Sequence, residues 1–278
     1  MKLRNRWFTQ KRFAYASICW YNSYYQSIND RRAKMKKRLI ITAITAVLCG
    51  AIFSCSNLEK GAAGPAGEEG ASNTASLSFQ NGVFPSNAYQ GCVDALITTG
   101  YPDYNHGSCQ YINVGPYDSF TLFRGLIYFD MTPVIPKDVI VVKASLDVFV
   151  IGLTGSVDMA AYAAGKYWNG GTVCGASQNG SVTWMSSAHN SALWGSPGGD
   201  YGSKKSDTVN INASAKWYSL SLDPELVESW ISSPEENFGI IIKAEDEITV
   251  LNRAQFYSSD YTTDAAFRPK LTVIYRLP

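Results

Sequence analysis

The sequence has 278 residues, 46% of them hydrophobic, with 24 Lys and Arg against 23 Asp and Glu. Residues 1–54 hold 11 of the basic side chains and one acidic side chain, so the part from Cys55 onward carries 13 basic and 22 acidic ones, a net charge of −9. This acidic body argues against a nucleic-acid partner, because binding to phosphates needs clustered cations. The 224 residues from Cys55 onward are enough for one sizeable hydrophobic core.

The N-terminal part predicts export and lipidation. Lys36, Lys37 and Arg38 precede the uncharged 15-residue run Leu39–Phe53, which is shorter than the roughly 20 residues that span a bilayer and is typical of a signal peptide. The run leads into Ile52-Phe53-Ser54-Cys55, which resembles a lipobox. We therefore expect residues 35–54 to be a lipoprotein signal peptide and Cys55 to carry a membrane-anchoring lipid; the alternative is an ordinary signal peptide with an incidental Cys.

The segments on either side of this signal have simpler interpretations. Met35 begins a complete signal, so residues 1–34 are predicted to be an upstream extension ahead of the true start; a cytosolic extension on an uncleaved anchor is the alternative. Residues 55–75 contain four Gly-X-Y triplets from Gly61, a collagen-like tract that is too short for a triple helix alone and predicts a flexible tether. Trimerisation through this tract remains an alternative. Ser56, in place of an Asp, favours the outer membrane or cell surface, an extracytoplasmic location.

From residue 76 to 278 the pattern predicts an all-β fold, an antiparallel β-sandwich or jelly roll with one short helix, preceded by a signal helix and a disordered linker. Short segments of period-two character are separated by turn clusters. The predicted strands are Ala75–Gln80, Ala95–Thr98, Tyr111–Val114, Thr121–Phe129, Ala144–Val150, Met159–Ala163, Thr208–Ile211, Tyr218–Leu222, Phe238–Lys243, Ala254–Ser258 and Leu271–Tyr275. The helix is Pro224–Ile231, with Asp223 as its N-cap and an apolar face that includes Trp230.

An ordered series of short motifs also resembles a known family. The motifs are Asp94–Ile97, Pro102–Gly107, Ile112–Gly115, Phe123–Asp130, Ile135–Pro136, Ala144–Leu146, Val182–Trp184, Trp230 with Asn237–Lys243, Phe256–Ser259 and Arg268–Val273. Over roughly Asp94–Tyr275 this series resembles the DNRLRE domain. The resemblance implies an extracellular β-sandwich similar to polysaccharide-binding modules.

Strand Phe123–Asp130 places Arg124, Leu126, Tyr128 and Asp130 on one face and the intervening residues on the other. One face is predicted to be core. Arg124 is interpreted as the partner of a nearby carboxylate or strand-end carbonyl, with a ligand contact as the alternative.

The cysteines agree with export. Cys92 and Cys109 flank the predicted strand Ala95–Thr98 and its Pro102–Asn105 loop, and a bridge between them would close an 18-residue loop, worth about 3 kcal/mol by loop-closure entropy. We predict this pair, with Cys174 left over. A Cys/His zinc site is the rival interpretation, although the chain has two His and no Cys-x-x-Cys spacing.

The sequence carries no catalytic motif of the common hydrolase, metalloprotease or nucleotide-binding kinds. His106 is interpreted as a loop residue, and the carboxylates after Pro224 as a solvated surface. Asp103 with Asn105, or Asp118, are weak candidates for a structural Ca²⁺; no cofactor is required.

Aromatic side chains in turns are the candidate ligand-binding residues, because a sugar presents a flat apolar face that stacks on an exposed ring. Trp184 and Trp230 are expected in the core. The candidates share turn-like sequence or a cationic charge near loops: Trp194, Tyr101, Tyr104, Tyr117, Tyr201, Arg124 and Lys166.

Three functions remain open at this stage. The first is a lipid-anchored surface module that binds polysaccharide or glycan without catalysis. The second is a structural or adhesive envelope protein that contacts other proteins. The third, a polysaccharide-cleaving enzyme, has no catalytic constellation in its favour.

Overall fold

The computed structural model describes residues 73–132 and 134–278. The predicted upstream extension, signal peptide, lipidated Cys55 and nearly all of the tether lie outside the described residues. The strands are β1 (Thr74–Phe79), β2 (Cys92–Thr98), β3 (Tyr111–Pro116), β4 (Leu122–Phe129), β5 (Ile140–Thr154), β6 (Val157–Ala164), β7 (Ser186–Ala188), β8 (Ala192–Leu193), β9 (Tyr201–Lys204), β10 (Val209–Ile211), β11 (Lys216–Leu222), β12 (Ile240–Ala244), β13 (Arg253–Tyr257) and β14 (Lys270–Arg276). The first strand begins at Thr74, so the last two residues of the predicted tether belong to it.

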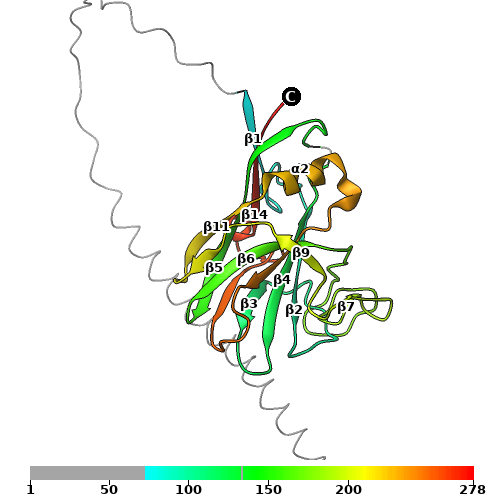
Figure 1. Ribbon diagram of the computed structural model, residues 1–278, viewed down its shortest axis with the longest axis vertical. Coiled ribbons are helices and arrows are strands. Elements are labelled where there is room, and N and C mark those ends of the chain that lie inside the picture. The colour runs from blue at the N-terminus through cyan, green and yellow to red at the C-terminus, as the bar shows by residue number, and fades with distance from the viewer. Residues whose placement is uncertain (1–72, 133) are drawn as a thin grey trace, which may run out of the picture. The chain divides into compact units, whose positions relative to one another are not determined.

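The strands form an antiparallel, sandwich-like fold of two layers, as predicted (Figure 1). In the first layer β5 pairs with β11 along one edge and with β14 and then β13 along the other, while β1 pairs with β14. In the second layer β4 lies between β2 and β12, and β6 joins β12 to β9 and β10. Strand β3 connects the layers, since it pairs with β13 and then with β4.

The main core lies between the layers and follows from the alternation of side chains along each strand. In β5 the buried positions are Ala144, Leu146, Val148 and Val150, and the corresponding residues of β4 are Ile127 and Phe129. Helix α2 (Pro224–Ser232) adds Val227, Trp230 and Ile231 to this core, and the Asp223 side chain accepts a hydrogen bond from Glu225 N at its start. The predicted helix, cap and buried Trp230 are thus confirmed.

A second, smaller core covers the outer surface of the β2–β4–β12 layer. The connection between β6 and β9 (residues 165–200) folds over this surface and places Trp168, Val182, Trp184 and Trp194 there. They pack with apolar residues of the layer: Ala95, Ile97, Leu126 and Ile241. This connection, which includes the β7–β8 hairpin, was not predicted as a layer.

The longest helix among the described residues is α2, and none of their helices is long and apolar enough to cross a membrane.

One buried carboxyl, Asp94 in β2, makes stability depend on pH. Burial raises its pKa to about 7, and the hydrogen bond from Ser259 N to Asp94 Oδ2 only partly opposes this effect. The folded state therefore holds this proton more tightly than the unfolded chain, whose Asp pKa is about 3.9. The contribution of Asp94 to the free energy of unfolding should therefore fall as pH rises from about 4 through 7. Asp260, whose pKa burial also raises, acts in the same direction.

Urea denaturation across that pH range measures the effect: relative to Asp94→Asn, the parent should lose free energy of unfolding as pH rises. His106, whose pKa burial lowers to about 4, acts oppositely between about pH 4 and 6.5. The carboxyls with lowered pKa, Asp200, Asp223 and Asp246, act oppositely below about pH 4. An Asp94→Asn variant with the parental slope would show that another group causes it.

Candidate functional site

Trp194 does not stand free of the core, contrary to our prediction. Its side chain is 5% exposed, and its indole Nε1 donates to Thr183 O at 3.0 Å. A turn does follow Trp194, and it is stabilised by Gly195 N and Ser196 N, which both donate to the Asp200 carboxylate. The turn lies over the second core, however, so that the ring points inward. Trp184 is buried in the same core, as predicted.

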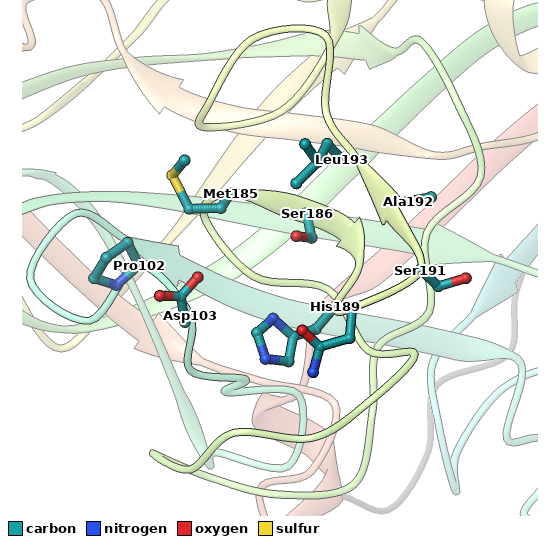
Figure 2. Close-up of a pocket in the computed structure, with 9 residues that line it drawn as sticks. Pro102, Asp103, Met185, Ser186, His189, Ser191, Ala192 and Leu193 are labelled. Atoms are coloured by element: carbon teal, nitrogen blue, oxygen red, sulfur yellow. The ribbon is translucent and has the colours of Figure 1, made fainter.

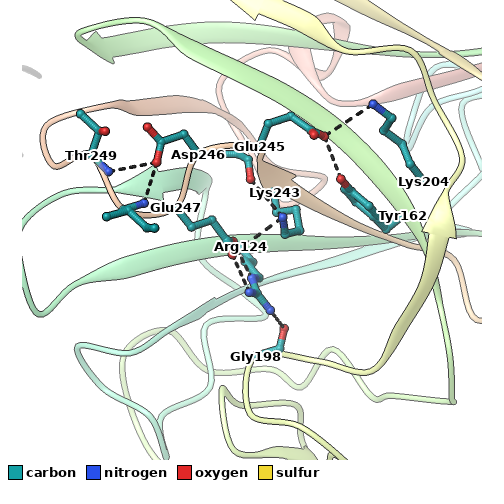
Figure 3. A network of polar contacts seen from close by, with 11 residues as sticks. Arg124, Tyr162, Gly198, Lys204, Lys243, Glu245, Asp246, Glu247 and Thr249 are labelled. Atoms are coloured by element: carbon teal, nitrogen blue, oxygen red, sulfur yellow. Dashed lines mark hydrogen bonds and ion pairs between the residues drawn. The ribbon is translucent and has the colours of Figure 1, made fainter.

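Arg124 lies in a network of ion pairs between β4 and the loop after β12 (Figure 3). Its Nε and Nη2 each donate to the Glu247 carboxylate at 2.7 Å, and its Nη1 donates to Gly198 O at 2.7 Å. A Cβ at position 198 would lie 2.6 Å from Nη1, so glycine is required for this approach. The prediction that Arg124 pairs with a carboxylate is confirmed, and its nitrogens are committed to the fold.

Tyr201 joins the same network from β9. Its ring lies 5.3 Å from the Arg124 guanidinium and 5.8 Å from Lys243 Nζ, and it contacts Tyr162 edge to face. The Tyr162 hydroxyl donates to Glu245 at 2.8 Å, and burial together with this bond raises its pKa to about 12. Two predicted residues, Arg124 and Tyr201, are therefore brought together, with charges largely compensated within the network.

The remaining ligand candidates lie in other places. Lys166 forms an ion pair with Asp200 at 3.3 Å and donates to Leu193 O. Tyr101 and Tyr104 stack on each other in the β2–β3 loop, with ring centroids 5.5 Å apart. Tyr117, in the β3–β4 loop, lies under the Arg253 guanidinium. With Trp194 buried, these rings do not form the single platform that the sequence suggested.

Two of the three Ca²⁺ candidates, Asn105 and Asp118, are engaged in other hydrogen bonds. The Asn105 amide is fully buried and donates to Gly170 O and Val182 O. Asp118 accepts from Phe120 N within its own turn, and Asp103 is exposed. A Ca²⁺ site stays a prediction that these contacts do not support.

The disulfide differs from the predicted pair. Cys109 is bonded to Cys174, with Cα atoms 4.9 Å apart, and Cys92 is a buried free thiol. The Cys92–Cys109 prediction was wrong because Cys92 begins β2 with its side chain in the main core, whereas the β6–β9 connection brings Cys174 to the β2–β3 loop. The bridge fixes that connection to the strand layer.

A surface pocket of about 540 Å³ lies between the β2–β3 loop and the β7–β8 hairpin (Figure 2). Its lining includes Asp103, Ser186 and His189. The His189 Nε2 lies 3.0 Å from the Ser177 hydroxyl, however, and Ser186 is nearly buried, with its backbone N donating to Thr183 Oγ1. Among the described residues, no hydrogen bond joins the side chains of Asp103, Ser186 and His189 to one another.

The best platform in the described structure is a row of rings on the outer surface of the first layer, which we call the aromatic face: Trp217, Phe149, Tyr257 and Tyr111, flanked by Phe267 and Tyr261. The four rings of the row stand on the adjacent strands β11, β5, β13 and β3. Trp217 is the register partner of Phe149, and Tyr257 is that of Tyr111. Ring centroids are 5.4 Å apart for Trp217–Phe149, 6.1 Å for Phe149–Tyr257 and 5.8 Å for Tyr257–Tyr111.

The rings differ in exposure and carry polar groups beside them. Trp217 is 37% exposed, whereas Tyr261 is almost covered and stacks on Tyr257 at 3.7 Å. Lys270 Nζ lies 5.8 Å from the Trp217 ring and 3.1 Å from the Asp147 carboxylate. Burial and a hydrogen bond with Tyr261 raise the pKa of the Tyr257 hydroxyl, so it stays protonated.

Sequence reasoning missed this face, although a signal was present. In Lys216–Leu222 the buried residues are Tyr218, Leu220 and Leu222, so alternation turns Trp217 outward. The same rule turns Phe149 outward beside the buried Val148 and Val150. The expected platform rested on aromatic residues in turns and left out those on the outer side of strands.

The sequence profile of the disaggregatase related repeat domain matches residues 94–273, about two thirds of the chain. The chain belongs to the disaggregatase related repeat family. This is a different family from DNRLRE, so that resemblance is unconfirmed, while the sandwich-like fold that it implied is present. A search of curated proteins found no match.

The part that matches the disaggregatase related repeat begins at the buried Asp94 and ends within β14. It contains every ring of the aromatic face, the Arg124 network and the Cys109–Cys174 bridge. Strand β1 precedes it. The candidate site therefore belongs to the repeat domain itself.

Proposed function

We propose that this domain binds polysaccharide without catalysis, on the aromatic face. The observation that supports the proposal is the row of rings on four adjacent strands, with Trp217 exposed at one end. Strands lie about 4.8 Å apart, so three spacings give a row about 14 Å long. The planes of Trp217 and Phe149 lie at 70° to each other, and Tyr261 stacks on Tyr257. The stacking position for a sugar is therefore the exposed Trp217 ring.

The chemistry around the rings suits a sugar chain. An indole face packs against the C–H groups of a pyranose, while donors and acceptors at the edge bind its hydroxyl groups. At the Trp217 end, Lys270 supplies a donor and Asp147 an acceptor. Near Tyr257, Gln255 and Asn113 supply side-chain amides, with Gln255 Nε2 donating to Asn113 Oδ1 at 3.1 Å. Asp147, Gln255 and Asn113 come from the same strands as the rings, and Lys270 comes from β14, which pairs with β5.

The proposal keeps the surface location that the sequence suggests. This location is supported by the sequence of residues 36–55, which has a basic start, a short apolar run and the lipobox-like Cys55. In this arrangement a lipid at Cys55 holds the repeat domain at the outer membrane or cell surface.

Replacing Trp217 with alanine should weaken polysaccharide binding about 10-fold or more, the equivalent of about 1.4 kcal/mol, since the exposed ring supplies the stacking surface. Microarray binding to extracellular polysaccharides, followed by calorimetry on the best ligand, measures the change. Unfolding by urea should change little, because a ring that is 37% exposed leaves no closed cavity.

Phe120→Ala is the matched control, because Phe120 is 85% exposed and lies in the β3–β4 loop. It should bind as the parent does. If Trp217→Ala keeps full affinity, or if the parent binds no polysaccharide, the aromatic face is not a glycan site.

A specific observation also favours the second candidate, a structural or adhesive protein. Phe120 and Ile248 are 85% and 89% exposed, and each backbone N–H donates to an Asp two residues earlier, Asp118 and Asp246. The two loops are joined where Leu251 N donates to Tyr117 O. If Phe120→Ala abolishes adhesion of whole cells while Trp217→Ala does not, this second function replaces the first.

A further inference from the structure

The Cys109–Cys174 bridge, with His106 beside it, forms a cluster that is independent of the aromatic face. The His106 Nδ1 lies 3.7 Å from Cys109 Sγ. The ligand atoms of His106, Cys109 and Cys174 all lie within 4.8 Å of one another, and no other group of three or more His, Cys, Asp or Glu among the described residues meets this condition. Two thiolates and an imidazole are a donor set that suits zinc and other soft metal ions.

The backbone holds these three residues together without help from the bridge. Asn105 N donates to Ala176 O, Gly175 N donates back to Asn105 O, and Ser108 N donates to Val173 O. The buried Asn105 side chain adds bonds to Gly170 O and Val182 O. The two cysteines therefore remain opposite each other when the sulfur–sulfur bond is broken.

The imidazole of His106 presents one ring nitrogen, Nδ1, to the sulfurs. Its other nitrogen, Nε2, is buried and has no hydrogen-bond partner. With the proton on Nε2, the lone pair of Nδ1 faces Cys109 Sγ.

Cys174 is open to solvent. It lies exposed next to Gly175, where an added Cβ would meet no heavy atom within 4 Å. An ion can therefore reach the two sulfurs while the hydrogen bonds around Asn105 persist.

We infer that the reduced form of Cys109 and Cys174, together with His106, is a zinc site, and that the disulfide is the metal-free, oxidised form of this site. A dithiol reductant supplies two electrons and two protons and becomes a disulfide, giving two thiols in this chain. Zn²⁺ then displaces both thiol protons to solvent as two Zn–S bonds and one Zn–N bond form. A water occupies the fourth tetrahedral position.

The test uses the full chain carrying Cys19→Ser, Cys49→Ser and Cys55→Ser, which removes the thiols upstream of the described residues. The protein is reduced with a phosphine under anaerobic conditions, desalted and titrated with Zn²⁺. Co²⁺ as a second probe reports thiolate coordination by its charge-transfer and d–d absorption bands. We expect one ion per reduced chain and none per oxidised chain.

Variants assign the ligands. Cys174→Ser and His106→Ala should each weaken Zn²⁺ binding at least 100-fold, since loss of a direct ligand costs more than the roughly 10–100-fold that loss of an outer partner costs. Cys92→Ser is the matched control, because burial raises the pKa of that thiol well above its usual value and keeps it protonated in the main core. It should bind as the parent does.

Circular dichroism accompanies each titration. If the reduced parent is folded and takes up no Zn²⁺, or if uptake persists in Cys174→Ser, the inference is wrong. If reduction unfolds the parent, addition of Zn²⁺ should restore the β signal, and failure to do so also overturns the site.

Discussion

Trp194→Ala is expected to lower the free energy of unfolding by about 3–5 kcal/mol, as for other large aromatic residues removed from a core. The indole fills the second core between the β6–β9 connection and the strands that carry Ala95, Leu126 and Ile241. Its removal leaves a cavity and also leaves Thr183 O without the bond from Nε1. Urea or thermal unfolding of the purified domain, followed by circular dichroism, measures the loss.

Leu193→Ala, at the preceding position, is the control for this substitution. Leu193 is 69% exposed, and its truncation should change the free energy of unfolding by about 0.5 kcal/mol or less. If Trp194→Ala proves as mild as Leu193→Ala, the second core does not contribute to the stability of the domain, and Trp194 returns as a surface candidate.

Removal of the Cys109–Cys174 bridge should cost about 4 kcal/mol by loop-closure entropy. The bridge joins residues 65 positions apart, and a longer closed loop removes more entropy from the unfolded chain than the 18-residue loop of the predicted pair. Cys174→Ser, measured with a chelator present to exclude metal, should show this loss in urea unfolding.

Reduction of the parent protein is the matched measurement. With chelator and reductant it should unfold at the same urea concentration as Cys174→Ser, and Cys174→Ser should not respond to reductant. A parent whose unfolding midpoint is unchanged by full reduction would contradict the expected contribution of the bridge.

The strands and the helix could be predicted because their signals are local. Leu146, Val148 and Val150 alternate with polar or exposed positions in β5, and Asp223-Pro224 begins α2 by capping. These patterns depend on residues a few positions apart, and their physical causes are the strand period and the unsatisfied amides of a helix start.

The site could be predicted only in part because its contacts join distant segments. Arg124 was expected to meet a carboxylate, but its partner, Glu247, is 123 residues away. The Gly-rich sequence after Trp194 indicated a turn and does form one. Burial of the ring follows from where the whole β6–β9 connection packs, which no local pattern specifies. Cys92 is a similar case: it shares a face of β2 with Asp94, so alternation alone would have turned it toward solvent, whereas the structure buries both residues.

The long strand β5 has a consequence for mechanical load. Thr74, the first residue of β1, pairs with Arg276 of β14, and Arg276 pairs with Ile140 at the start of β5. At the other end of β5, Thr154 pairs with Arg253 of β13. Arg253 lies beside the β3–β4 and β12–β13 loops. Suppose that Thr74 is pulled along the strand axis while those loops are held fixed. The force then passes through the hydrogen bonds between β1 and β14. The hydrogen bonds of that ladder are perpendicular to the strands, so its six residue pairs bear the force together in shear rather than opening one after another.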